Sequence, residues 1–283
     1  MAMLKTAHKI VLARIASRAI TLGRSALGLP AEGVFTRGGI RWGLDLREGI
    51  DFSIFLLGGF ELQNLRAYSE LIKSGDDVLD IGANIGAHTL PLARLVGPTG
   101  RVIAFEPTNF AAAKMRANIA LNPDLAPRIS FHQAMLVANT GAVPEPALFS
   151  SWPLVGGGHL HEKHKGRLME THGARAVTLD QMMVELGVDK VDFVKLDVDG
   201  HELPVLQGSR ATLSGFRPLI AMELAPYIHA EFGYSFDEMV ALLKSWRYEF
   251  RSLSTKAILP QAAEALRALV PDGAGISVLA VPS

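Results

Sequence analysis

The fold is decided by residues 76–89, which read DDVLDIGANIGAHT. The apolar run around Val78 and Leu79 is typical of a parallel strand that is covered on both faces. Gly82 and Gly86 follow this run, and glycines allow the backbone to turn sharply where a ligand approaches closely. Helical spacing of apolar residues begins beside the second glycine. A strand that leads into a helix through glycines places a ligand at the carboxyl edge of an open α/β sheet.

The spacing of the glycines restricts the kind of ligand. A dinucleotide-binding turn reads G-x-G-x-x-G, whereas this turn reads D-x-G-x-x-x-G and carries Asp80 on the strand itself. A carboxylate there suits a ligand with a cationic part, and S-adenosylmethionine carries an ammonium and a sulfonium group. Residues 101–107 predict the next strand, which ends at Glu106, where an acid can accept hydrogen bonds from both ribose hydroxyls. An NAD site and an ordinary strand-turn-helix are the alternatives.

Five segments carry a resemblance to a known family, and they are residues 78–86, 104–107, 178–180, 195–202 and 222–223. Together they resemble class I S-adenosylmethionine-dependent methyltransferases and, more narrowly, the FkbM family. The resemblance implies an α/β, Rossmann-like class I methyltransferase fold with about seven mostly parallel strands flanked by helices. It also implies that the last strand runs antiparallel between the fifth and the sixth. The family usually has Glu where this chain has Asp199, and a small residue where it has His201.

The resemblance also implies which residues bind the cofactor. They lie in the glycine turn, in the acid-proline pair after the second strand, and just after a third strand at 129–132, where the adenine is approached. The cofactor-binding residues predicted in this way are Asp80, Gly82, Ala83, Asn84, Gly86, Glu106, Pro107, Gln133 and Ala134. Family members often methylate hydroxyl groups, so we expect O-methylation of a saccharide or a glycosylated small molecule. Nitrogen and carbon acceptors are the alternatives.

Acidic side chains end the fourth and fifth predicted strands, at the edge of the sheet where open α/β folds place their chemistry. A sugar hydroxyl must lose its proton before it attacks a methyl group, either to a general base or with help from a divalent cation. Asp197 and His201 are the candidate catalytic bases. Asp197, Asp199 and Glu223 are the candidate ligands of Mg²⁺, which prefers oxygen donors. Capping or ion pairing is the alternative role for Asp197 and Glu223.

The segment from 139 to 176 is the least regular part of the sequence, because prolines and a run of glycines interrupt it. His159, His161 and His164 follow one another there in the pattern H-x-H-x-x-H. Metal ligation, contact with the substrate and a solvated surface loop are the three interpretations of these histidines. Trp152 in the same segment either stacks on a sugar ring or anchors the loop into the core.

The N-terminal residues differ from the rest of the chain. Residues 1–30 contain basic side chains and no acid, and their apolar spacing predicts a helix. This helix packs on the domain or on a second subunit, contacts a membrane surface, or is a transit-type presequence. Residues 33–46 predict a β-hairpin around a Gly-Gly pair. We therefore expect an extension of helix and hairpin over residues 1–58 and a methyltransferase domain over residues 59–283.

Composition limits the remaining choices. The chain has 283 residues, of which 49% are hydrophobic, so it can build a sizeable core. Its 28 basic and 28 acidic side chains balance, which gives no argument for a nucleic-acid partner. The absence of cysteine excludes disulfides and fits a cytoplasmic location, with membrane-peripheral attachment as an option. Homo-oligomerisation is left open. The alternative functions are an NAD-type oxidoreductase and a non-catalytic adaptor that uses the basic N-terminal helix.

Overall fold

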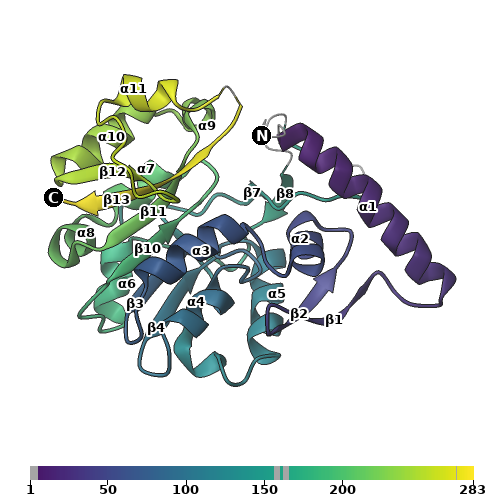
Figure 1. The fold of residues 1–283 in the computed structure, drawn as a ribbon. Helices are drawn as coiled ribbons and strands as arrows, with labels where there is room; N and C mark the ends of the chain where they lie inside the picture. The colour runs from purple at the N-terminus through teal and green to yellow at the C-terminus, as the bar shows by residue number, and fades with distance from the viewer. Residues whose placement is uncertain (1–5, 156–159, 162–165, 272) are drawn as a thin grey trace.

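The computed structural model describes residues 6–155, 160–161, 166–271 and 273–283. It is built around a seven-stranded sheet in the order β12-β13-β11-β10-β3-β4-β5 (Figure 1). The strands are β3 (Asp77–Ile81), β4 (Arg101–Phe105), β5 (Ile129–His132), β10 (Phe193–Leu196), β11 (Leu219–Leu224), β12 (Tyr248–Ser252) and β13 (Ile276–Pro282). Only β13 is antiparallel to its neighbours β11 and β12 within this sheet. The predicted fold class is confirmed, including the antiparallel last strand.

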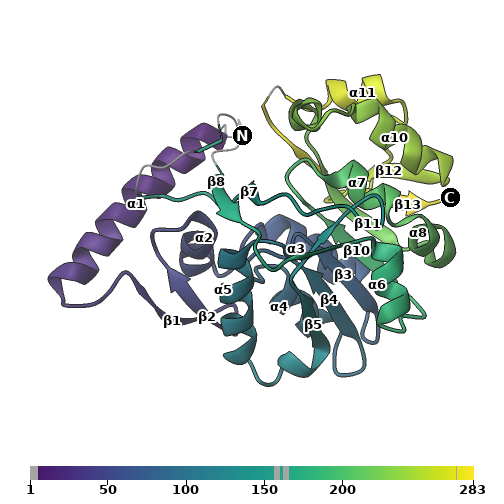
Figure 2. The same ribbon diagram turned by 180° about the vertical axis from the view of Figure 1, so that it is seen from behind.

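Helices cover both faces of the sheet, which explains why the central strands are apolar without alternation. Leu79 of β3 and Val194 of β10 belong to one core cluster, whereas Val78 and Phe193 belong to the other. The first face is covered by α6 (Leu179–Glu185), α7 (Glu202–Gln207), α8 (Arg210–Phe216) and α10 (Phe236–Ser245). The second face is covered by α3 (Leu62–Leu71) and α4 (Thr89–Leu95), with α5 (Asn109–Ala120) beside it (Figure 2).

The N-terminal extension has the predicted helix and hairpin. It consists of α1 (Thr6–Ala26), β1 (Glu32–Arg37) and β2 (Ile40–Asp45), followed by α2 (Gly49–Leu57), which the sequence analysis did not anticipate. Trp42 and Leu44 of β2 are buried against the second core cluster, while α1 runs along the outer side of the molecule (Figures 1 and 2). Within the described ranges, no helix combines the length and the apolar character needed to cross a bilayer.

Two parts of the chain after β5 differ from the pattern expected of them. The segment from 139 to 176 contains a hairpin of β7 (Ala147–Ser150) and β8 (Arg167–Glu170), and β6 (Ala134–Leu136) pairs with β9 (Arg175–Val177). The regular helical stretch from 201 to 213 is divided into α7 and α8. A Cβ atom on Gly208 at the break would lie 2.0 Å from the carbonyl oxygen of Val137. The carboxylate of Asp180 then accepts the backbone N–H of Thr212 in the first turn of α8 (2.8 Å).

Smaller elements complete the C-terminal part. They are α9 (Pro226–His229), a 3₁₀ turn at Ala230–Phe232 and α11 (Ala263–Ala268). The Ser235 side chain and Glu238 form a reciprocal capping box at the start of α10, a pairing that satisfies two backbone donors which would otherwise lack partners.

Candidate active site

The glycine turn at the end of β3 has a backbone shape that other residues cannot adopt. Gly82 has φ +79°, and a Cβ atom on it would lie 1.8 Å from the carbonyl oxygen of Asp197. The backbone N–H groups of Gly82 and Ala83 both donate to the carbonyl of Phe105 at the end of β4 (3.0 and 2.9 Å). Gly86 has φ +89°, and a Cβ atom there would meet the Met115 sulfur. The turn is therefore held against both neighbouring strands.

Lys195 is the buried cation around which this edge of the sheet is arranged. Its Nζ donates to the carbonyl of Gly82 (2.8 Å) and lies 3.4 Å from Asp80 Oδ1 and 3.6 Å from Asp197 Oδ2. Burial alone would lower the pKa of Lys195, but the carboxylates of Asp197, Asp80 and Glu61 outweigh it and raise that pKa. The sequence analysis considered Lys195 only as the ion-pair partner in the alternative role of Asp197 and Glu223, and the structure shows its pair with Asp197. The available signal was a single cation inside an apolar strand.

Asp80 supports the turn from inside the protein. Its side chain is fully buried and accepts a hydrogen bond from the Thr89 hydroxyl (2.5 Å) while it pairs with Lys195. In the register of the parallel sheet, Asp80 of β3 lies opposite Lys195 of β10. Direct contact between Asp80 and the cofactor therefore stays a prediction, and the observed contacts give Asp80 a role in fixing the lysine.

Glu106 joins the end of β4 to the glycine turn. One carboxylate oxygen accepts the backbone N–H of Asn84 (3.0 Å), and the other accepts the backbone N–H of Thr108 (2.9 Å). Burial raises the pKa of Glu106 against these hydrogen bonds. Pro107 follows directly, and the side chain of Gln133 bonds to Asn109 (2.7 Å).

Gln133 and Ala134, the residues predicted to approach the adenine, lie just after β5 and contact other protein groups. Ala134 is buried at the start of β6, and the guanidinium of Arg116 donates to Gln133 Oε1 (3.0 Å). The amide of Gln133 therefore already has protein partners on both of its polar atoms, through Asn109 and Arg116. The adenine contacts of Gln133 and Ala134 stay predictions.

A cleft opens beside Lys195, at the carboxyl ends of β10 and β11 and along α3. Its lining includes Glu61, Asn64, Tyr68, Lys195, Asp197, Glu223, Leu253 and Ser277. Asp197 is 34% exposed at this edge. Glu61 lies 3.3 Å from His88 Nε2 and accepts a hydrogen bond from the Asn64 amide (2.9 Å). The cleft thus combines one buried lysine with three carboxyl groups that solvent reaches.

Strained backbone conformations mark the same region. Glu61, Asn84 and Asp199 are non-glycine residues in the left-handed region, with φ of 47°, 48° and 49°. Such conformations cost of order 1–3 kcal/mol each and are concentrated at functional sites. Glu61 lines the cleft, Asn84 belongs to the glycine turn, and Asp199 lies two residues after Asp197 beyond the end of β10. Ser151, Arg217, Arg247 and Lys256 have the same kind of conformation, so the strain is not specific to this edge.

The carboxyl groups of the cleft do not share one ionisation behaviour. Glu223, at the end of β11, is accessible in the cleft but closely surrounded by protein. Desolvation and the charges of Asp197 and Glu61 raise the pKa of Glu223 well above its ordinary value. Hydrogen bonding and charge from His88, aided by Lys195, outweigh desolvation and lower the pKa of Glu61. Two carboxyl groups that line one cleft thus have pKa values shifted in opposite directions.

The predicted metal ligands are not arranged as a metal site. Among the residues that the structure describes, no group of three His, Asp or Glu side chains is placed to hold an ion. Asp199 is exposed on the turn after β10, and Asp197 instead faces Lys195. Of the histidine run, His159 and His164 lie outside the described residues, and His161 bonds to Glu231 (2.7 Å).

His201, the second candidate base, lies against other partners. Its Nε2 is 3.3 Å from Glu145 Oε1, and its ring centroid is 4.1 Å from that of Phe232. Glu145 comes from the segment before β7, so the His201 imidazole joins that segment to the start of α7. A catalytic role for His201 stays a prediction.

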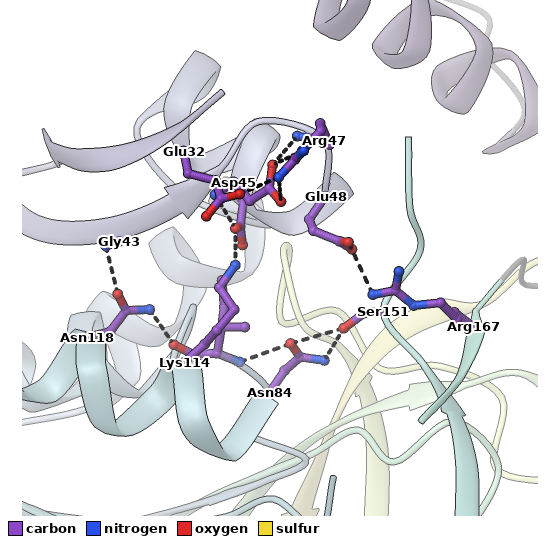
Figure 3. A network of polar contacts seen from close by, with 12 residues as sticks. Glu32, Gly43, Asp45, Arg47, Glu48, Asn84, Lys114, Asn118, Ser151 and Arg167 are labelled. Atoms are coloured by element: carbon purple, nitrogen blue, oxygen red, sulfur yellow. Dashed lines mark hydrogen bonds and ion pairs between the residues drawn. The ribbon is translucent and has the colours of Figure 1, made fainter. Parts of the chain in front are cut away.

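The N-terminal extension is linked to the glycine turn through side chains of α5 (Figure 3). The side-chain oxygen of Asn118 accepts the backbone N–H of Gly43 in β2 (2.8 Å), and its amide donates to the carbonyl of Ile85 (2.9 Å). Lys114, one turn earlier on α5, forms an ion pair with the buried carboxylate of Asp51 in α2. Helix α5 therefore connects the hairpin of the extension to the cofactor turn.

The β7–β8 hairpin rests on the same turn from the other side (Figure 3). The Asn84 amide donates to the hydroxyls of Ser150 (3.2 Å) and Ser151 (3.1 Å). Arg167 of β8 donates to Glu48 just before α2 (3.1 Å). Trp152 lies against Gly49, where a Cβ atom would be 2.2 Å from its ring. Of the two roles considered for Trp152, the structure shows the anchoring one.

This combination of sheet and site defines a class I methyltransferase: a seven-stranded sheet with an antiparallel last strand, a glycine turn after β3 and an acid after β4. The chain belongs to the family of the methyltransferase FkbM domain, whose family model matches residues 80–250. The family supports S-adenosylmethionine as the cofactor, and it gives no support to the NAD-type or adaptor alternatives.

Relatives with curated names show the same class. The chain is 29% identical over 164 residues to methyltransferase sdnD of Sordaria araneosa, 27% over 156 residues to hexuronic acid methyltransferase AglP of Haloferax volcanii, and 29% over 165 residues to 2-O-methyltransferase NoeI of Sinorhizobium fredii. The matches cover 48%, 53% and 53% of this chain. They cover 61%, 59% and 63% of the relatives, so the chain spans about six-tenths of their length.

Solved methyltransferases align with the chain at TM-scores below 0.5. A methyltransferase FkbM from Methylobacillus flagellatus has a TM-score of 0.44 at 18% identity, covering 83% of this chain and 56% of that one. A SAM-dependent methyltransferase from Aquifex aeolicus has a TM-score of 0.44 at 15% identity, covering 83% of this chain and 95% of that one.

Proposed function

We propose that this protein transfers the methyl group of S-adenosylmethionine to a hydroxyl oxygen of a saccharide or a glycosylated small molecule. The observation that carries the proposal is Asp197, an accessible carboxylate 3.6 Å from the buried Lys195 and next to the glycine turn. Two relatives named for the methylation of a hexuronic acid and of a 2-O position support the acceptor class. The lack of cysteine is consistent with a reducing compartment such as the cytoplasm.

The residues present fit the cofactor. Glu106 is buried at the end of β4, the position of a ribose-binding acid in such folds, and two backbone donors fix its carboxylate. Only glycine fits at position 82, because any side chain there would collide with the backbone of Asp197 just after β10. Glu61 and Asp197 line the cleft with negative charge, which suits a ligand that carries a sulfonium and an ammonium group. When bound, S-adenosylmethionine supplies an electrophilic methyl group.

The chain's own groups then have separate tasks. Asp197 accepts the proton of the acceptor hydroxyl, because it is a solvent-accessible carboxylate at the edge where two strand ends meet. Lys195 fixes that carboxylate and the carbonyl of Gly82 at once, so the base and the turn keep a constant separation. Glu223 lines the same cleft at the end of β11, where it can contact another oxygen of the acceptor. Activation of the hydroxyl by Mg²⁺ is the competing route.

Calorimetric titration with S-adenosylhomocysteine, together with transfer of labelled methyl groups to a panel of hexuronic acids and neutral sugars, tests the proposal. We expect Glu106→Ala to weaken binding by about 1–3 kcal/mol, the range for a hydrogen bond to a charged group. We expect Asp197→Asn to keep binding and to lose about 10²–10⁴ in turnover, the range for a general base. Unchanged turnover of Asp197→Asn at saturating donor contradicts the base role. Turnover that depends on added Mg²⁺ and stops with chelator favours the competing route.

A further inference from the structure

Helix α1 contacts the body of the protein through one face only. The Ser17 hydroxyl, fully buried, donates to the carbonyl of Leu46 (2.6 Å), and Ala13, Ala16 and Ile20 pack beside it against the second core cluster. These positions recur at intervals of three and four residues, so they share one side of the helix. In the part of α1 whose side chains the structure describes, the residues on the other side are exposed, and they are Leu12, Ile15, Arg18, Ala19 and Leu22.

That exposed side carries large apolar residues. Leu12, Ile15 and Leu22 are 56%, 62% and 71% exposed, and with Ala19 between them they follow one another at intervals of three, four and three residues. Such spacing forms a single stripe along a helix. Scattered apolar residues on a surface need no explanation, whereas a continuous stripe marks an interaction site.

Exposed apolar residues are also concentrated in the extension as a whole. Eight of the fifteen large exposed apolar residues in the described chain fall within the first 58 residues, about a fifth of the sequence. They are Leu12, Ile15, Leu22, Leu27, Leu29, Val34, Leu56 and Leu57. The catalytic part of the chain has no comparable density, so this surface belongs to the extension and not to the methyl-transfer site.

The formal charge of residues 1–31 favours one kind of partner surface for the stripe. Residues 1–31 contain five Lys and Arg residues and no Asp or Glu, so they carry a formal charge of +5, and the remaining 252 residues carry −5, which gives the neutral total. Pairing with a second copy of α1 would bring two such basic segments together with no acid to offset them. An anionic lipid surface offers both a negative charge and an apolar layer below it.

We propose that α1 lies in the interfacial layer of an anionic lipid membrane, with Leu12, Ile15 and Leu22 inserted and Arg18 beside the headgroups. Arg18 is exposed on the helix next to the stripe, and its long stem allows the guanidinium to reach phosphate while the stem covers apolar surface. The inference concerns where the protein works and does not depend on the methyl acceptor.

Co-sedimentation of the full chain with vesicles tests this proposal. We expect about tenfold or greater preference for phosphatidylcholine vesicles that contain phosphatidylglycerol over pure phosphatidylcholine, and loss of that preference in high salt. The double variant Ile15→Glu with Leu22→Glu removes binding. The matched control Val184→Glu, at an apolar residue of α6 that is 82% exposed, keeps it.

The mass of the protein in solution, measured in the same experiments, distinguishes a lipid surface from a second copy of the chain as the partner of the stripe. Because all the substituted side chains are exposed, the variants are expected to keep the wild-type far-ultraviolet circular dichroism. A wild type that ignores phosphatidylglycerol vesicles at low salt overturns the proposal. A dimer that the double variant dissociates, without any vesicle binding, assigns the stripe to a second copy of the chain instead.

Discussion

Glu202 should make the protein less stable at neutral pH than a neutral isostere would. This residue is buried at the start of α7, where one carboxylate oxygen accepts the backbone N–H groups of Val198 and Gly200 (3.3 Å each). The other oxygen lies 4.0 Å from His229 Nε2. Burial raises the pKa of Glu202 to about 7 and lowers the pKa of His229 to about 4. Above neutral pH, a buried negative charge therefore stands beside an uncharged imidazole.

The magnitude follows from the shift in pKa. The ordinary value for Glu is 4.5, and the folded value is about 7. An acid with a raised folded pKa contributes no penalty below its unfolded value, and the protein then loses stability as the pH rises toward the folded value. Each pKa unit corresponds to about 1.4 kcal/mol, so the loss is about 3 kcal/mol. Glu202→Gln keeps the acceptor oxygen and avoids the charge, so it should be more stable by about that amount at about pH 8.

Urea unfolding at about pH 4.5 and about pH 8 measures this difference, with Glu264→Gln as the matched control on an exposed helix position. Because each variant is compared with the wild type at the same pH, other buried acids such as Asp51, whose pKa is about 6, cancel from the difference. We expect a stabilisation of Glu202→Gln that fades toward about pH 4.5 and none for the control. A variant no more stable than the wild type at about pH 8 would refute the reasoning.

Two glycine substitutions test the geometry of the site. Gly82→Ala should abolish S-adenosylhomocysteine binding and destabilise by more than the ~1–2 kcal/mol of a left-handed alanine, because its Cβ would lie 1.8 Å from a carbonyl oxygen. Gly141→Ala, with φ +85° and open space around it, isolates the backbone cost in the same thermal melts. Gly49→Ala should displace Trp152, seen as a red shift in fluorescence and a loss of ~1–3 kcal/mol. Gly215→Ala, in open space on a helix, should leave the tryptophan fluorescence unchanged and leave the stability unchanged or slightly improved.

The central sheet could be predicted from the sequence because its signals are local. The strands β3, β4, β10, β11 and β13 read as short, mainly apolar runs, and burial on both faces of the sheet explains their lack of alternation. Helix α2 gave no such signal, since the segment around Phe52 is apolar on most sides and shows no helical period. The strands β7 and β8 are short and only half-buried, so they carry no clear alternation either.

The candidate site was predictable in its motifs and not in its pairings. The glycine turn and Glu106 are read from adjacent residues, and the structure brings them together through Asn84. The central position of Lys195 depends on the register between two strands that are more than a hundred residues apart in the chain. The contact of His201 with Glu145 likewise joins distant segments, so spacing along the chain contained no information about it.

The bonding of the extension to α5 ties the region matched by the family to residues outside it, so we expect that region to be less stable alone. A chain starting after residue 58 would lose Asp51, and Lys114 would keep a partly buried ammonium without its counter-ion. Asn118, completely buried, would lose its bond to Gly43 while it still supports Ile85. The extension therefore supplies contacts to the catalytic core, and we expect that a core moved into another protein needs residues 1–58 as well.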